Sequence, residues 1–274
     1  MSRRRVPVRR KIAAATWRAP RDGRIYARME VDATATLAYL EDVRQRSGER
    51  VTVTHVVGAA LGRAIRQVPE IRARVVAGRI VDLEHCDIGF AVDIEQGSDL
   101  APVKVQDVDT LSPLELARAV DAGARRLRRG EDEAYRRSSM IVRLLPTGLM
   151  RPLISSASLL AGGLGWRAFG QPGFPLGAAF VSNVGSLGLD EAFLAPLPFA
   201  RTPVYLAIGA VQQRPVVVDG SVVARPVLVL VATADHRVVD GAHAGEMATV
   251  IRDLLAHPER LERPATGVPA AARS

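Results

Sequence analysis

A histidine between two aspartates is the part of this 274-residue sequence best suited to chemistry. His236 lies in the run DHRVVDG (235–241), directly after a long apolar segment and before an amphipathic one. An imidazole group titrates at about pH 6.5, so at neutral pH it is mostly uncharged and can accept a proton from a thiol or an alcohol. Asp240 can orient this histidine, or pair with an arginine and hold the loop. The pattern is short, and taken alone it also occurs in loops that do no chemistry.

The same run has a metal-binding alternative. His236, Asp240 and His243 can converge on an ion, because imidazole and carboxylate groups are common zinc ligands. The change from strand to helix at Gly241 leaves their geometry undetermined. We therefore predict no metal site.

The second candidate is Ser182, which opens the run SNVGSLG (182–188) after a short apolar strand. A hydroxyl at a strand end can donate a hydrogen bond to the oxyanion of a tetrahedral intermediate. A glycine-rich turn without chemistry is the simpler interpretation when this run is taken alone.

The elements that position these residues follow from hydrophobic periodicity and turn residues. Strands are predicted at 25–31, 72–77, 79–83, 86–94, 102–106, 177–182, 203–211, 215–218, 222–224 and 226–234. Helices are predicted at 34–46, from a Thr54 cap to Gln67, from a Ser112–Glu115 capping box to Arg129, and at 241–256. Two more helices, broken at Pro146 and Pro152, are expected within 131–175. Since helices and strands do not alternate strictly, we expect an α/β (α+β) fold with a mixed sheet flanked by helices.

The net charge of +8 is confined to one end of the chain. Residues 1–24 hold nine basic groups and one acid, whereas the remaining 250 residues carry 28 of each sign. A neutral body argues against a nucleic-acid-binding domain. The basic arm can still contact an acidic partner, nucleic acid or an anionic membrane.

Two further features indicate the compartment. Cys86 is the only cysteine, which excludes an intrachain disulfide and favours the reducing cytoplasm. The uncharged stretch 152–166 has 15 residues, fewer than the roughly 20 of a spanning helix, so no transmembrane segment is expected.

Taken together, the serine and histidine runs, about 50 residues apart, resemble a known family. This is the catalytic domain of the dihydrolipoamide acyltransferase component of 2-oxoacid dehydrogenase complexes, which has a chloramphenicol acetyltransferase-like fold. The matching motifs are SNVG (182–185), AIG (207–209), RPVV (214–217) and DHRVVDGA (235–242). Weaker matches are Thr54–Pro69, DIGFAVD (87–93), Pro102-Val103 and the last helix through Pro258.

The resemblance implies a mechanism and an assembly. His236 is expected to take the proton from the thiol of coenzyme A or dihydrolipoamide, and Ser182 to hydrogen-bond the oxyanion. Asp240 is expected to orient the histidine or support its loop. The resemblance further implies a homotrimer with His236 and Ser182 from different chains, acyl-CoA as a substrate, and no metal.

The chain also departs from the family pattern. We divide it into a flexible basic arm (1–24), a catalytic domain (25–262) containing an apolar insertion (143–175), and a C-terminal tail (263–274). With only a short arm before the domain, no covalent lipoyl group is expected on this chain, and a separate lipoyl-carrying protein is a candidate partner. The segment GSDLAP (97–102) replaces the usual glycine-leucine-x-x-proline, so the substrate channel can differ.

Three other functions remain open. One is coenzyme-A-dependent transfer to an amine or an alcohol, and another is a non-catalytic trimeric scaffold of the same fold. Nucleic-acid binding through the basic arm is the least favoured. The arm itself is either a disordered tail or an electrostatic attractor for an acidic lipoyl carrier.

Overall fold

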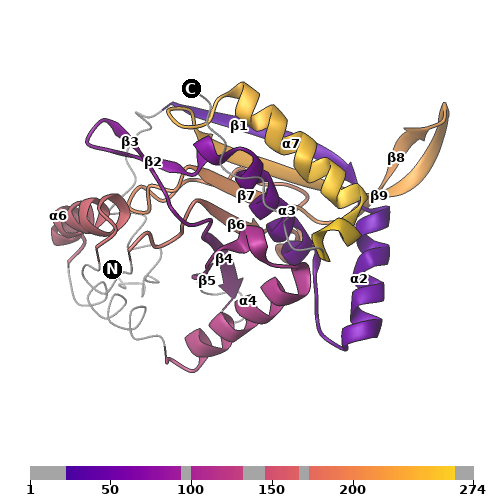
Figure 1. Ribbon diagram of the computed structural model, residues 1–274, viewed down its shortest axis with the longest axis horizontal. Helices are drawn as coiled ribbons and strands as arrows, with labels where there is room; N and C mark the ends of the chain where they lie inside the picture. Colours follow the sequence, from indigo (N-terminus) through magenta and orange to yellow (C-terminus); the bar gives the residue numbers. More distant parts are fainter. Residues whose placement is uncertain (1–22, 94–99, 132–145, 167–172, 263–274) are drawn as a thin grey trace, which may run out of the picture.

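The sheet that carries both candidate residues has seven strands (Figure 1). The computed structural model describes residues 23–93, 100–131, 146–166 and 173–262. The strand order is β1-β9-β7-β6-β4-β5, with β8 paired to β9. The strands are β1 (Arg24–Asp32), β4 (Ile88–Asp93), β5 (Leu100–Val105), β6 (Ala179–Asn183), β7 (Val204–Ile208), β8 (Gln212–Val218) and β9 (Ser221–Asp235).

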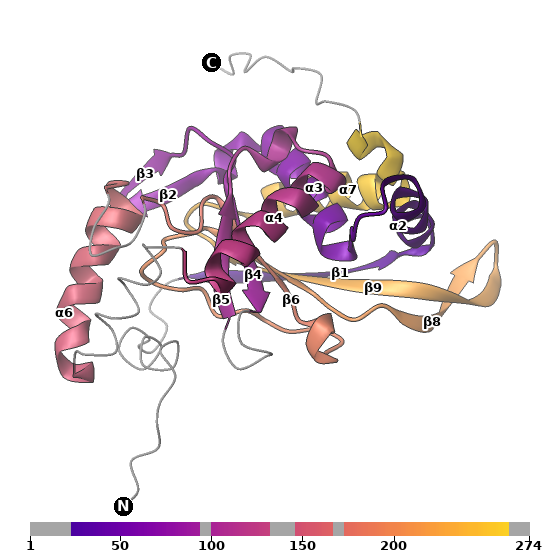
Figure 2. The same ribbon diagram turned by 90° about the horizontal axis from the view of Figure 1, so that it is seen from below.

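Strand direction confirms the expected mixed sheet. β6 runs parallel to both β4 and β7, whereas β9 is antiparallel to β1, β7 and β8. A separate hairpin is formed by β2 (Ala73–Val76) and β3 (Arg79–Asp82). β9 is the longest strand, and beyond the sheet it continues with β8 into a hairpin that projects from the body (Figure 2).

Helices cover one face of the sheet. They are α2 (Thr34–Ser47), α3 (Val53–Gln67), α4 (Pro113–Arg128) and α7 (Gly241–Ala256). α3 and α7 pack against each other, and their apolar side chains form one continuous core with the sheet. A further helix, α6 (Thr147–Ala157), continues into the π-helical turn η3 (Ser158–Gly163) at the end of the molecule opposite the β8–β9 hairpin (Figure 2).

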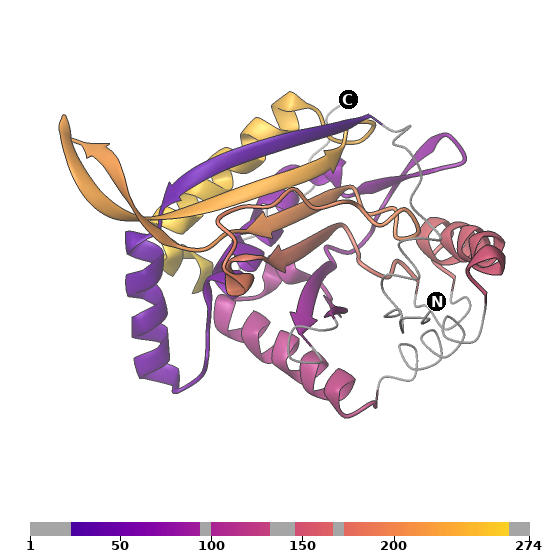
Figure 3. The ribbon, with the colours of Figure 1, turned by 180° about the vertical axis from the view of Figure 1, so that it is seen from behind.

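The opposite face of the sheet, which faces the reader in Figure 3, is packed against the segment 188–203. Leu194, Leu197 and Phe199 of this segment lie against apolar side chains of β6, β7 and β9. Since this segment follows Ser182 and precedes β7, it connects the two regions of chemical interest.

Most predicted elements are confirmed within a residue or two. The Ser112 capping box is present: Ser112 N donates to Glu115 Oε2 at 2.8 Å, and Glu115 N donates to Ser112 Oγ at 3.3 Å. The predicted cap of α3 is wrong. Thr52 is the N-cap, because its backbone N–H donates to His55 Nδ1 at 3.1 Å, and Thr54 lies inside the first turn.

Two of the proline-based interruptions, at Pro226 and Pro152, are also wrong, whereas α6 does begin directly after Pro146. The two strands predicted around Pro226 form the single strand β9. The Pro226 carbonyl accepts from Ala33 N just past the end of β1, so the missing N–H points to a side where no strand pairs. Pro152 lies within α6, where it removes one backbone hydrogen bond without ending the helix.

Several predicted segments lie outside the described residues. These are the C-terminal tail, residues 1–22 of the basic arm, and the parts 132–145 and 167–172 of the region expected to hold the insertion. Arg24, placed at the end of the arm, begins β1.

Candidate functional site

His236 is held by the ends of three strands. It follows the last residue of β9, Asp235, whose N–H donates to the carbonyl oxygen of Pro203 just before β7 at 2.9 Å. The N–H of His236 donates to the carbonyl oxygen of Gly23, just before β1, at 3.1 Å. These bonds fix the start of the turn 236–240, while His236 itself is exposed to solvent in the single chain.

The neighbouring Asp235 and Arg237 form a pair that supports this turn. Arg237 Nη2 lies 2.6 Å from Asp235 Oδ2, and Arg237 Nε lies 2.9 Å from Oδ1. Partial burial alone would raise the pKa of Asp235, but the hydrogen bonds from Arg237 lower it below its usual value. Asp235 is thus a charged structural partner of Arg237.

The His236 ring is oriented by a backbone carbonyl group. Its Nδ1 atom lies 2.9 Å from the carbonyl oxygen of Val239. A carbonyl oxygen only accepts hydrogen bonds, so Nδ1 carries the proton and Nε2 keeps the lone pair. This tautomer leaves Nε2 able to act as a base.

Asp240 caps the helix that follows. Its Oδ1 atom accepts a hydrogen bond from the N–H of His243 at 3.0 Å, and its own N–H donates to His243 Nδ1 at 3.3 Å. These contacts make Asp240 the N-cap of α7, and the His243 N–H lowers the pKa of its carboxyl group. No hydrogen bond joins Asp240 to the His236 ring in the described chain. Asp240 was expected either to orient His236 or to support its loop, and its contacts in the structure fit the second role.

Ser182 lies near the carboxyl end of β6, half-buried, and pairs with Ala207 of β7. The next residue, Asn183, donates from Nδ2 to Thr54 Oγ1 at 2.8 Å and accepts from Ser186 N at 3.0 Å. These bonds connect the end of β6 to the start of α3 and close the turn after Ser182.

Two glycines of the matching motifs are required by close packing at this turn. A Cβ atom on Gly185 would lie 2.5 Å from the backbone of Gly209 and Ala210. A Cβ atom on Gly209 would lie 1.8 Å from the carbonyl oxygen of Asp190. The segment after Ser182 therefore crosses β7 at a distance that excludes a side chain.

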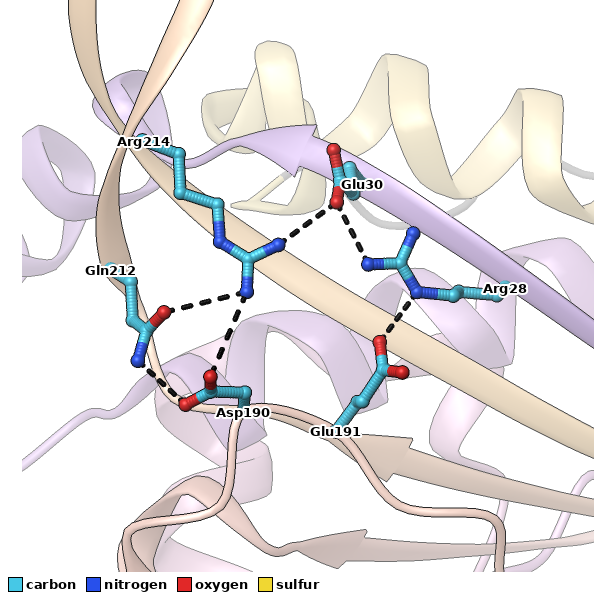
Figure 4. A network of polar contacts seen from close by, with 6 residues as sticks. All are labelled: Arg28, Glu30, Asp190, Glu191, Gln212 and Arg214. Carbon is cyan, nitrogen blue, oxygen red and sulfur yellow. Dashed lines mark hydrogen bonds and ion pairs between the residues drawn. The ribbon is translucent and has the colours of Figure 1, made fainter.

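A polar network fixes the same end of the sheet (Figure 4). Arg214 of β8 donates to Glu30 of β1 at 2.9 Å, and Gln212 donates to Asp190 at 2.6 Å. Arg28 of β1 pairs with both Glu30 and Glu191. In the sequence Arg214 is recognisable only as part of the RPVV motif, because its partners Glu30 and Asp190 lie on distant segments.

The strand register separates Ser182 from His236. Val204 of β7 pairs with Ala179 on one side and with Ala234 on the other. From this level Ser182 lies three residues toward the carboxyl end of β6, whereas His236 lies two residues past Ala234 in the opposite direction. Five residues at about 3.3 Å each correspond to roughly 16 Å along the strands. Within a single chain the register therefore does not bring the two side chains to one reacting carbonyl group.

The helix-covered side of the sheet contains an apolar cavity of ≈ 90 Å³. It lies between β1, β9 and α7 and is lined by small side chains such as Ala232, Ala244 and Ala248, with Val239 of the histidine turn among them. Its lining carries no acid–base group that adds to the site.

Two other findings concern alternatives. In the described ranges, no group of three or more histidine, cysteine, aspartate or glutamate side chains is placed to hold a metal ion. No helix of the described residues is long and apolar enough to cross a bilayer.

Comparison with known proteins assigns the family. The model for the catalytic domain of the 2-oxoacid dehydrogenases acyltransferase matches residues 3–135 and 176–262. The chain belongs to this family, which confirms the resemblance seen in its motifs.

Curated relatives are similar over most of this chain. The acetyltransferase component of the pyruvate dehydrogenase complex of Mycoplasma capricolum is 26% identical over 221 residues, covering 80% of this chain and 41% of the relative. The succinyltransferase component of the 2-oxoglutarate dehydrogenase complex of Rickettsia felis is 24% identical over 238 residues, covering 85% and 49%. This chain thus spans less than half the length of these relatives.

Solved structures show the same fold. A probable dihydrolipoamide acetyltransferase from Listeria monocytogenes superposes with a TM-score of 0.67 and 17% identity, covering 97% of this chain and 98% of the other. The dihydrolipoamide acetyltransferase of Azotobacter vinelandii gives 0.63 and 19%, covering 93% and 88%. The fold class expected from the sequence is therefore confirmed.

Proposed function

We propose that the protein is an acyltransferase that moves an acyl group between coenzyme A and a thiol acceptor such as dihydrolipoamide. The observation that carries this proposal is the 2.9 Å contact between His236 Nδ1 and the carbonyl oxygen of Val239. Because Nδ1 donates to the Val239 carbonyl oxygen, the basic Nε2 is available to a substrate thiol. Family membership supports acyl transfer as the reaction.

The reaction needs a base and an oxyanion donor. Nε2 of His236 takes the thiol proton, and the thiolate attacks the carbonyl carbon of the thioester. The resulting oxyanion accepts a hydrogen bond from the Ser182 hydroxyl group. When the intermediate collapses, the departing sulfur receives the proton from His236, and the acyl group has changed carriers.

Support for these two roles comes from a structural relative. In the Azotobacter vinelandii enzyme, a serine, a histidine and an asparagine have been investigated for their role in the catalytic mechanism. Ser182 and His236 are of the same types as the serine and the histidine. The third type, asparagine, is not matched by Asp240, to which we assign support of the loop.

We further propose that the active assembly is a homotrimer with sites between subunits. The register places Ser182 and His236 too far apart for one chain to form the site. The projecting hairpin exposes Val217 (72%) and Val222 (73%), and the edge-on ring pair of Tyr26 and Phe193 is also exposed. Exposed apolar surface of this kind favours burial against another subunit.

The remaining expectations concern partners and place. Acyl-CoA is the proposed donor, and a lipoyl-carrying protein separate from this chain is the proposed acceptor. Buried Cys86 as the only cysteine favours the cytoplasm. Transfer to an amine or an alcohol is the alternative activity.

The direct test measures transfer from acetyl-CoA and succinyl-CoA to free dihydrolipoamide, and to amine and alcohol acceptors in parallel. His236→Ala is expected to lower kcat by roughly 100- to 10,000-fold. The matched control is His257→Ala, because His257 is an exposed histidine that contacts Asp253 at the end of α7. Equal activity of the His236 variant, or no transfer by the unaltered protein, contradicts the proposal.

A further inference from the structure

Two arginines that pair with no carboxylate among the described residues lie where β2 meets η3. Arg74 of β2 is only 7% exposed, and Arg201, which precedes β7, is half-buried. The charged groups that shift their pKa values are themselves arginines. Besides burial, the charge of Arg201 lowers the pKa of Arg74, and the charge of Arg237 lowers the pKa of Arg201. In the described chain neither guanidinium makes a salt bridge.

The two guanidinium groups are held in place by backbone oxygens. Arg74 Nε donates to the carbonyl oxygen of Gly163 at 2.8 Å, and its guanidinium carbon lies 3.7 Å from the centre of the Phe174 ring. Arg201 Nε donates to the carbonyl oxygen of Ser158 at 3.1 Å, and its Nη1 donates to that of Val75 at 2.9 Å. These contacts orient both cations but do not neutralise them.

One donor of this cluster is unused. Arg74 Nη1 is buried and has no hydrogen-bond partner within the part of the chain that the structure describes. Burying an unpaired charged donor is costly, so native proteins normally give it a counter-charge. Burial, followed by the charge of Arg201, lowers the pKa of Arg74 to about 10. An anion at this place would remove both penalties.

The backbone around the cluster is also strained. Arg201 has a φ of 53° and Phe174 a φ of 50°, in the left-handed region that residues with a side chain seldom adopt. Strain of this kind persists where the surrounding structure enforces it, and it concentrates at ligand sites. Here the strained residues are Arg201 itself and Phe174, whose ring lies under the Arg74 guanidinium group.

The position of the cluster connects it to the candidate catalytic residue. Arg201 lies two residues before Pro203, whose carbonyl oxygen accepts the N–H of Asp235 next to His236. Arg237 is occupied by Asp235, so it is not a member of the unpaired set.

We propose that Arg74 and Arg201 form a binding site for an oxyanion, a carboxylate or a phosphate group, at the His236 end of the sheet. Two guanidinium groups with an unused N–H present the planar donor geometry that such anions accept. Under the proposed function, on which this step rests, the anion belongs to a substrate. It is either the free carboxylate of a dicarboxylic acyl group or a phosphate of coenzyme A.

The first experiment tests the site without catalysis. Binding of inorganic phosphate and of succinate is measured by calorimetry and by the rise in Tm, at constant ionic strength set with chloride. Arg74→Gln and Arg201→Gln are expected to weaken binding by roughly 10-fold or more, since each removes charge-assisted hydrogen bonds. Arg79→Gln is the control, because Arg79 is exposed on the neighbouring strand β3.

The outcomes are distinct. The proposal is supported if the unaltered protein and the Arg79 variant bind the probe anion with similar affinity while the Arg74 and Arg201 variants bind it roughly 10-fold more weakly or not at all. It is overturned if the unaltered protein binds neither anion, or if all four proteins bind equally. Should Arg74→Gln fail to fold, Arg74→Lys and Arg201→Lys test the same point, since they keep the charge but lose the planar fork.

The second experiment identifies the source of the anion. A preference for succinyl-CoA over acetyl-CoA that Arg201→Gln removes indicates the acyl carboxylate. A KM for coenzyme A that rises on loss of its 3′-phosphate in the unaltered protein, but not in the variant, indicates the phosphate. If no acyl transfer occurs at all, the proposed function fails while the binding result stands by itself.

Discussion

The Nδ1 atom of His236 lies 2.9 Å from the carbonyl oxygen of Val239, three residues further along the same turn. This bond sets the tautomer from within the turn and needs no acidic side chain. Asp240, the obvious acidic candidate, instead begins α7 by capping it. The ring orientation and the helix start are therefore linked through the backbone of residues 236–240.

Replacement of Asp240 separates these two roles. Asn is as good an N-cap as Asp, so Asp240→Asn is expected to keep both Tm and kcat close to those of the unaltered protein. Ala cannot accept the His243 N–H, so Asp240→Ala is expected to lower Tm and, by loosening the turn, to lower kcat about 10-fold. Thermal unfolding and steady-state kinetics of both variants measure this. If the Asn variant loses activity while its Tm is unchanged, the carboxylate itself takes part in the reaction.

A second prediction concerns stability at low pH. His55 is buried at the start of α3, and burial lowers its pKa to about 4. The unfolded chain, with an ordinary histidine pKa of about 6.5, therefore binds more protons between these values. The contribution of neutral His55 to the free energy of unfolding is expected to be complete above pH 6.5. It is expected to be lost as the pH drops toward 4, which lowers the free energy of unfolding by on the order of 3 kcal/mol at most.

Denaturant titrations at several pH values measure this dependence. His55→Gln is the informative variant, because glutamine at this position can keep the reciprocal contact with the Thr52 cap. Its stability is expected to vary less with pH in this window. An unchanged pH profile in the variant would show that another group is responsible.

Local patterns explain why so much of the fold could be predicted. The Ser112–Glu115 box marks a helix start by short-range chemistry and lies where expected. The helix predicted at 34–46 ends at Ser47, directly before the left-handed Gly48. The errors at Pro152 and Pro226 arise because the effect of a proline depends on what lies opposite its missing N–H. What lies opposite is decided by the tertiary structure, as the contact of Ala33 with Pro226 shows.

The candidate site divides in the same way. His236 and Ser182 could be predicted because each lies in a motif of consecutive residues. The Arg74–Arg201 cluster was missed, since each is one of 35 arginines and only the fold brings them together. Gly23, which fixes the His236 backbone, was assigned to the arm for a related reason: a single main-chain contact leaves no pattern in side-chain types.

The separation of Ser182 and His236 leads to a prediction about mixed assemblies. If each site combines His236 of one subunit with Ser182 of another, His236→Ala and Ser182→Ala chains can complement one another. Each variant alone is expected to be inactive, with Ser182→Ala lowering kcat roughly 100-fold or more. After joint refolding of equal amounts, about a quarter of the sites pair an intact histidine with an intact serine in a symmetric assembly. Recovery of about a quarter of the unaltered activity is therefore expected.

The control is the same two variants mixed without unfolding, or each refolded alone, which must stay inactive. A chain carrying both substitutions, refolded with the unaltered protein, gives the matching reference. In that mixture too, a quarter of the sites have both residues intact, so the activities of the two mixtures should agree. No recovery in the first mixture, with about a half retained in the second, would mean that one chain supplies both residues, because every unaltered chain would then keep an intact site. Such a result would contradict the separation of Ser182 and His236 by the register of β6, β7 and β9.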